Sequence, residues 1–134
     1  LVYRYDMRQS ERKRLVTLKD EDGDVLPCYA MSVDPMTPVY FILGGTSTYV
    51  QLFDVRSPSA PVARFAPRHL RSGRQDHVTG TAYDWTGREF VATYNDELIY
   101  RFHVDKDAVV QDEGPPVATA AASSSSSSSS ARPS

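Results

Sequence analysis

An aspartate and an arginine separated by one residue occur twice in the chain, each time directly after an aromatic residue. The first copy is YDMR, with Asp6 and Arg8, and the second is FDVR, with Asp54 and Arg56. An arginine guanidinium can bind carboxylate or carbonyl oxygens through two parallel hydrogen bonds, and a neighbouring aspartate can hold it in the required orientation. These four residues are therefore candidates for binding a partner protein. The alternative is a structural role, in which the aspartate caps a turn and the arginine lies on the neighbouring repeat.

Other combinations of reactive side chains do not indicate catalysis. Asp96 and Glu97 are adjacent in a predicted tight turn and would point in different directions. We interpret the single cysteine, Cys28, as a small buried side chain in a strand. No glycine-rich phosphate loop or Cys/His metal-ligand spacing is present, and no catalytic partner stands at a suitable spacing from the histidines, His69, His77 and His103. We expect a protein that is not an enzyme and needs no cofactor.

The two Asp-x-Arg copies mark a repeat. Asp54 follows Asp6 by 48 positions, and Phe102 follows Phe53 by 49 positions. These periods lie a little above the roughly 40–45 residues of a four-stranded propeller blade, and loop insertions are the usual cause of such an excess. The charged stretch 19–24 and the basic connection 67–76 are the candidate insertions. We interpret the basic connection as a solvated loop, although its arginines could contact phosphates.

The order of strands and turns also recurs within each period. Runs rich in β-branched and aromatic residues predict strands, and a turn with Gly87 free to take positive φ follows the first strand of the second complete copy. The expected strands are 28–33, 39–45 and 49–55 in one copy and 78–83, 88–94 and 98–104 in the next, with outer strands at 14–18 and 61–66. Helical spacing of apolar residues is absent. The sequence predicts an all-β fold of about two propeller blades plus a strand end.

Composition limits the class of protein further. The chain has 134 residues, 40% of them hydrophobic, which suffices for a packed core. The formal net charge of −2 supplies no overall field that would attract nucleic acid or an anionic membrane. The longest apolar run, residues 39–43, is too short to span a bilayer. With one cysteine and no possible internal disulfide, we expect an intracellular protein of the nucleus or cytoplasm with neither membrane nor nucleic acid as a partner.

The last part of the chain differs from the rest. Residues 108–134 contain two adjacent prolines, an alanine run and eight consecutive serines. Such a segment cannot bury enough apolar surface to offset the entropy lost on ordering. We therefore expect a partial propeller over residues 1–107 and a disordered tail over 108–134.

The number of blades predicts an open structure. A propeller closes with about four to eight blades, and each blade covers a face of its neighbour. We therefore interpret the chain as a fragment of a larger protein or a truncated gene product. Its open faces should expose apolar residues such as Phe41, Leu43 and Phe90. Trp85 could either plug the base of a blade or contact a partner, and we favour the plug.

With these strands, turns and endings, the chain resembles a stretch of a WD-repeat β-propeller, with Tyr5-Asp6 and Phe53-Asp54 in the place of the usual Trp-Asp. It resembles more narrowly the WD-repeat substrate receptors of cullin-4 RING ubiquitin ligases, in the branch that includes the WD-and-tetratricopeptide proteins. The resemblance covers about residues 1–104. It is carried by YDMR, FDVR, RFAPRHL (64–70) and ATYNDELIYRF (92–102).

This resemblance implies a protein that presents an unknown protein substrate to the ligase. It would dock on the propeller adaptor known as the damaged-DNA-binding protein through Asp6, Arg8, Asp54 and Arg56. The third repeat ends in Phe-His-Val without aspartate or arginine, so it should not dock in the same way. The alternative is a WD-repeat scaffold in a chromatin or RNA-processing assembly with no link to a ligase.

Overall fold

The structure is a computed structural model that describes residues 1–20, 22–72 and 76–109. Over these residues the regular elements are β-strands and one short 3-10 helix. They are β1 (Val2–Tyr5), β2 (Arg12–Val16), β3 (Cys28–Val33), β4 (Tyr40–Gly45), β5 (Val50–Asp54), β6 (Ala63–Phe65), η1 (Arg68–Leu70), β7 (Val78–Tyr83), β8 (Glu89–Tyr94) and β9 (Ile99–His103). The all-β prediction is confirmed. The predicted tail lies outside the described residues from residue 110 onward.

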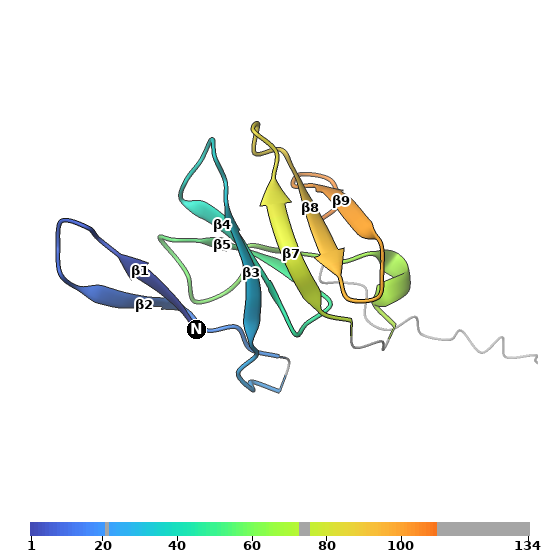
Figure 1. The fold of residues 1–134 in the computed structure, drawn as a ribbon, viewed down its shortest axis with the longest axis horizontal. Helices are drawn as coiled ribbons and strands as arrows, with labels where there is room; N and C mark the ends of the chain where they lie inside the picture. The colour runs from blue at the N-terminus through green and yellow to red at the C-terminus, as the bar shows by residue number, and fades with distance from the viewer. Residues whose placement is uncertain (21, 73–75, 110–134) are drawn as a thin grey trace, which may run out of the picture.

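The strands form three antiparallel sheets in which each strand pairs with the next one in the chain (Figure 1). The sheets are β1-β2, β3-β4-β5-β6 and β7-β8-β9. A meander of four consecutive antiparallel strands is the form of a propeller blade. The four-stranded sheet has this form, and the other two sheets correspond to parts of it, as expected of a partial propeller.

The repeat predicted from the sequence also appears in the pairing register of the strands. Phe41 on β4 pairs with Phe53 on β5, and 49 positions later Phe90 on β8 pairs with Phe102 on β9. The rings are stacked in both pairs, with centroids 5.7 Å and 5.2 Å apart. A register irregularity follows the first residue of both β3 and β7. Equivalent residues therefore occupy equivalent places in two separate sheets.

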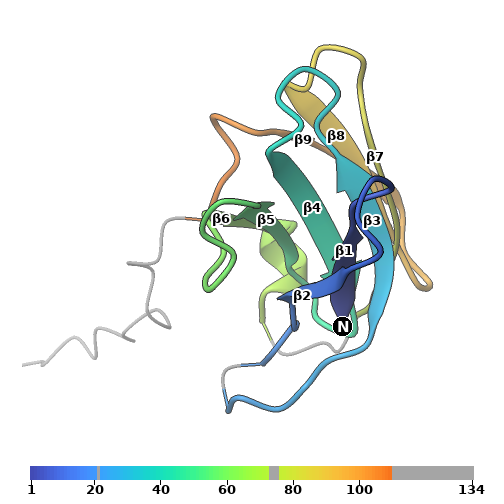
Figure 2. The same ribbon diagram turned by 90° about the vertical axis from the view of Figure 1, so that its left-hand side faces the viewer.

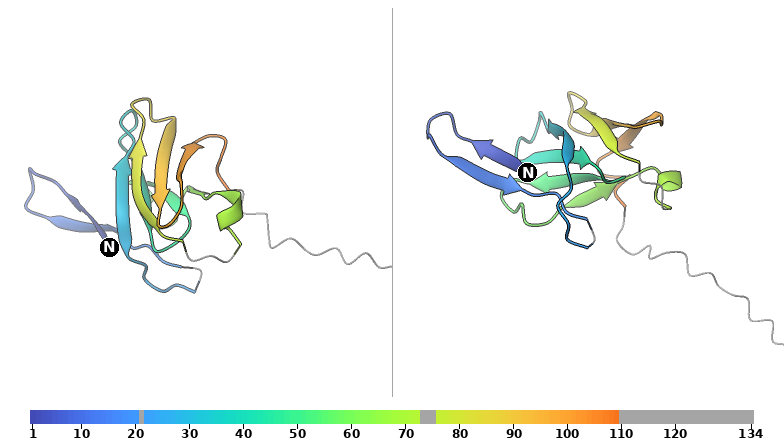
Figure 3. Two further views of the ribbon diagram at one scale, coloured as in Figure 1. Left: turned by 45° about the vertical axis from the view of Figure 1, so that its right-hand side comes forward. Right: turned by 60° about the horizontal axis from the view of Figure 1, so that its bottom comes forward.

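The two larger sheets meet along their first strands. β3 and β7 lie side by side in Figures 1 and 3, and the Tyr83 backbone N–H donates a hydrogen bond of 3.3 Å to the Ser32 hydroxyl. Gly44 on β4 faces Val78 on β7 so closely that a Cβ at Gly44 would overlap the valine side chain. The absence of a side chain at this position lets the two sheets approach.

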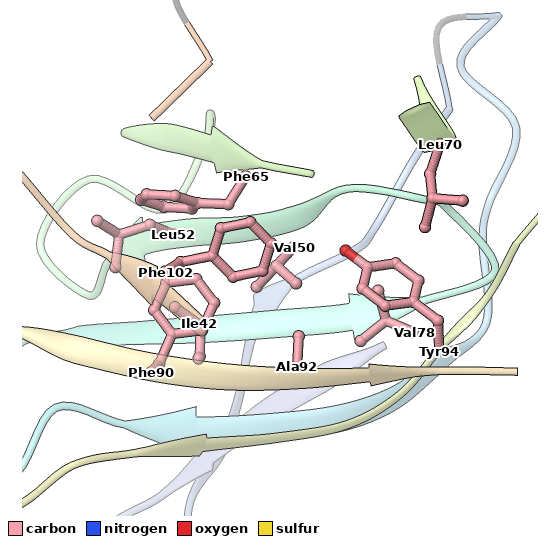
Figure 4. Close-up of a cluster of buried hydrophobic side chains, with 10 residues drawn as sticks. All are labelled: Ile42, Val50, Leu52, Phe65, Leu70, Val78, Phe90, Ala92, Tyr94 and Phe102. Carbon is pink, nitrogen blue, oxygen red and sulfur yellow. The ribbon is translucent and has the colours of Figure 1, made fainter. Parts of the chain in front are cut away.

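Strand β4 divides the core into two clusters because alternate side chains point to opposite faces of a strand. Ile42 faces the β7-β8-β9 sheet, and Figure 4 shows it among the rings of Phe65, Phe90 and Phe102. Phe41 and Leu43 face the β1-β2 hairpin, which lies nearest the viewer in Figure 2. The second cluster consists of Val16, Leu18, Phe41, Leu43 and Phe53.

The prediction of open apolar faces is wrong for the three residues named. Phe41 is 3% exposed, Leu43 is 0% exposed and Phe90 is 1% exposed. The β1-β2 hairpin and the segment that follows it cover one face of β4 with Val16 and Leu18. Phe65 from β6 covers Phe90, with the two rings edge to face at 5.0 Å. Partial blades thus bury β4 and the inward-facing residues of β8.

The basic connection is not a solvated loop throughout. It forms η1, whose Leu70 is buried in the first core cluster. The Arg71 guanidinium donates two hydrogen bonds, of 3.1 Å and 2.9 Å, to the Ala66 carbonyl.

The Val109 backbone N–H donates a hydrogen bond of 2.7 Å to the carbonyl of Arg64 on β6. Tertiary contacts therefore continue two residues beyond the predicted boundary at residue 107.

Trp85 does not plug the base of a blade. Its side chain is 83% exposed in the turn between β7 and β8. The turn is closed by Asp84, whose carboxylate accepts hydrogen bonds from the Thr86 hydroxyl and the Glu89 backbone N–H. Gly87 has the positive φ of 69° that the sequence predicted. Polar contacts hold this turn in place, and the indole, which lies in solvent, does not pack in it.

The close approach at Gly44 leads to a test of how the sheets meet. Gly44→Ala should lower the free energy of unfolding by about 1–3 kcal/mol, because the added methyl overpacks against Val78. Val78→Ala should cost about 2 kcal/mol through the cavity it leaves. The double variant should be more stable than the sum of the two costs implies by about 1 kcal/mol, because the smaller side chain makes room for the methyl. Chemical denaturation of the four proteins measures this coupling, and strictly additive costs would contradict the packing.

Candidate functional site

The two Asp-x-Arg segments fold into the same turn at the ends of equivalent strands. The carbonyl oxygen of each aspartate accepts a backbone hydrogen bond from the residue three positions later, at 3.0 Å for Asp6 and 3.1 Å for Asp54. The carboxylate Oδ1 accepts a second one from the arginine N–H, at 2.9 Å to Arg8 and 2.8 Å to Arg56. Aspartate favours such turns because its short side chain mimics a backbone acceptor. Both aspartates therefore cap a turn, as the alternative, structural interpretation of these segments predicts.

The arginine side chains differ in how firmly they are held. Arg56 forms a forked pair with Asp54, with Nη2 2.7 Å from Oδ2 and Nε 3.0 Å from Oδ1. Its guanidinium carbon also lies 6.0 Å from the centre of the Tyr40 ring. The Arg8 Nε lies 3.6 Å from the Asp6 carboxylate, which is an ion pair without the fork. Arg56 is therefore the better oriented of the two.

Both arginines project towards solvent despite these contacts. The side chain of Arg56 is 65% exposed, and that of Arg8 is 92% exposed. The turn after β1 and the loop after β5 both lie on the left side of the molecule in Figure 1. In each turn the aspartate is used locally while the guanidinium remains accessible, which is the geometry needed to reach a partner.

The ion pair also fixes the charge state of the second turn. The forked hydrogen bonds from Arg56 lower the pKa of the Asp54 carboxyl below its ordinary value, and the same contacts raise the pKa of the arginine. Both groups are charged in the neutral range at their ordinary pKa values, and the pairing extends the pH range over which both stay charged. A carboxylate that stays ionised keeps the guanidinium oriented over that range.

The third repeat closes its strand differently. The backbone N–H of His103 donates a hydrogen bond of 2.7 Å to the Asp107 carboxylate, so the capping acid comes from four residues later. The His103 ring lies 3.0 Å from a carboxylate oxygen of Glu89. This turn presents neither the aspartate nor the arginine of the other two, as its sequence predicted.

A further polar site was missed from the sequence. A cavity of about 470 Å³ lies between the β6-η1 connection and the end of β9, and its cationic lining residues are Arg68, Arg71, Arg101 and Lys106. We call it the basic cavity. The sequence indicated a basic stretch around Arg68 and Arg71, but Arg101 and Lys106 lie about thirty residues further on. Only the folded chain brings the two groups together.

Compared with models of known protein families, the chain matches none of them. Over residues 1–20, 22–72 and 76–109, no helix is long and apolar enough to cross a membrane. The same residues contain no group of three or more His, Cys, Asp or Glu side chains placed to hold a metal ion.

The charge coupling in the second turn can be measured directly. We expect the carboxyl of Asp54 to titrate below the ordinary pKa of about 3.9 and Arg56→Gln to return it towards that value. Because the folded pKa is lowered, the pair stabilises the fold above the unfolded pKa, and this contribution is lost as pH falls through the folded value. Carbon-detected NMR titration of the carboxylates gives the measurement. Asp84, whose pKa is lowered chiefly by the Thr86 hydroxyl, is the internal control and should not change.

Proposed function

We propose that this chain is part of a WD-repeat substrate receptor of a cullin-4 RING ubiquitin ligase and docks on the propeller adaptor through Arg56 and Arg8. The observation that carries the proposal is the recurrence of one turn geometry at equivalent strand ends, with an oriented and exposed arginine in each. The ubiquitin chemistry belongs to other subunits.

Preorganisation of the guanidinium supports the role given to Arg56. A free arginine side chain loses substantial rotamer freedom when a partner fixes it, and this loss weakens binding. Asp54 already restricts Arg56 through the forked pair of 2.7 Å and 3.0 Å. The remaining N–H groups can then meet carboxylate or carbonyl oxygens of the adaptor at a lower entropic cost. Arg8, without the fork, contributes less.

Arg56 is held more firmly than Arg8, and this difference leads to a quantitative prediction. Arg56→Ala should weaken adaptor binding by about 2 kcal/mol or more, which is roughly thirtyfold, because a desolvated interface arginine is lost. Arg8→Ala should have a smaller effect. Calorimetric titration with the purified adaptor measures the affinity, and thermal unfolding of each variant measures stability. Arg88→Ala, an exposed arginine in the turn before β8, is the matched control and should bind like the unchanged chain.

Each alternative predicts a different result in the same experiment. Binding of Arg56→Ala within about twofold of the unchanged chain, a change below 0.5 kcal/mol, removes the docking role. A fall in melting temperature together with binding assigns Arg56 a structural role instead. If the unchanged chain does not bind the adaptor, the generic scaffold of a chromatin or RNA-processing assembly becomes the better interpretation.

A further inference from the structure

The basic cavity lies away from the two arginine turns. In Figure 1 η1 and β9 are on the right side of the molecule, whereas the turns after β1 and β5 are on the left. Its lining comes from the β6-η1 connection on one side and from β9 and the following turn on the other. A ligand here would leave Arg8 and Arg56 accessible.

Positive charge dominates the lining. Four of the residues that line the cavity are cationic and one, Asp107, is acidic. An Asp107 oxygen is occupied by the hydrogen bond of 2.7 Å from the His103 backbone N–H. Arg101 lies 3.8 Å from Glu89, yet its side chain remains exposed. Several cationic residues around one recess create a local positive potential that the net charge of the chain does not reveal.

The cavity has a partly rigid wall. The Arg71 guanidinium is anchored by its two hydrogen bonds to the Ala66 carbonyl, so its charge is held in a fixed position. Ala66 and Phe102 also line the cavity and are buried in the fold. The hydrogen bond from Val109 to Arg64 fastens the segment that forms the opposite wall. Arg68, Arg101 and Lys106 are exposed, so water and salt screen their attraction for an anion, which depends on several cations acting together.

We propose that the basic cavity binds a peptide segment that carries clustered negative charge, as phosphoserine or as adjacent carboxylates. A phosphoryl group offers three acceptor oxygens and nearly two negative charges, which suit a cavity with cationic residues in both walls. Adjacent glutamates offer the same chemistry with more dispersed charge. This inference does not depend on the docking of the two turns to the adaptor.

A peptide fits the surroundings better than a nucleic acid does. Base stacking requires accessible aromatic faces, but the lining supplies one polar aromatic side chain, Tyr100, whose hydroxyl is hydrogen-bonded at 3.0 Å to Glu97 and lies 3.0 Å from His69. Glu97 contacts the Tyr100 hydroxyl and Glu89 lies 3.8 Å from Arg101, so two carboxylates stand beside lining residues and disfavour a long phosphate backbone.

Fluorescence anisotropy with labelled peptides tests the proposal on the full chain. The probes are a phosphoserine peptide, its unphosphorylated form, a peptide with adjacent glutamates and its glutamine counterpart. We expect the charged peptides to bind and the uncharged ones to bind at least about tenfold more weakly, because charge-assisted hydrogen bonds are lost. The tighter of the two charged peptides identifies which source of charge the cavity prefers.

The double variant Arg68→Gln/Arg101→Gln should weaken binding of the charged peptides by about tenfold or more, and Lys106→Gln should weaken it less. The control Lys13→Gln/Lys19→Gln changes the net charge equally on the side of the hairpin and should bind normally. An equal loss in the control would show non-specific attraction and overturn the proposal. So would equal binding of charged and uncharged peptides, or tighter binding of a single-stranded oligonucleotide of matched charge. We expect the cavity variants to bind the adaptor like the unchanged chain, so this experiment tests peptide binding separately from docking on the adaptor.

Discussion

The rest of the structure depends on the burial of β4 on both faces. Its side chains alternate between two clusters, with Ile42 in one and Phe41 and Leu43 in the other. Each such side chain contributes roughly 1.5–3 kcal/mol when it is fully removed from water. Neither cluster is complete without a second layer, so both the β1-β2 hairpin and the β7-β8-β9 sheet are needed to cover this one strand. A short chain of separate sheets thereby becomes a single packed body.

The same strand sets the position of the arginine turn. β5 is held in register by β4, with Asp54 opposite Tyr40, so the turn must begin where this pairing ends. Glu89 and His103 form the equivalent pair on β8 and β9. The repeated scaffold thus presents a comparable loop at each strand end, and the local residues decide what that loop offers. In two repeats it offers an arginine held by aspartate, and in the third it offers a histidine beside Glu89.

Much of the fold could be predicted because its signals are local. Alternation of apolar residues has the period of a strand, and the bonds that close the turns at Asp54, Asp84 and Gly87 span only a few residues. The candidate pair Asp54 and Arg56 was visible for the same reason, since both partners of the fork lie within three residues of each other. The burial of Phe41 could not be predicted in this way. It depends on contacts with Val16 and Leu18, which the hairpin brings back over the strand.

The sequence by itself determined the strands, their order, the repeat and the residues of the two turns, because backbone periodicity and short-range hydrogen bonds are written into neighbouring residues. Only the tertiary structure decided that Leu70 enters the core while Trp85 stays in solvent. It also decided that Arg68 and Arg101 line one cavity. These outcomes depend on which surfaces meet when separate sheets pack, and packing joins residues whose distance along the chain carries no information about their distance in space.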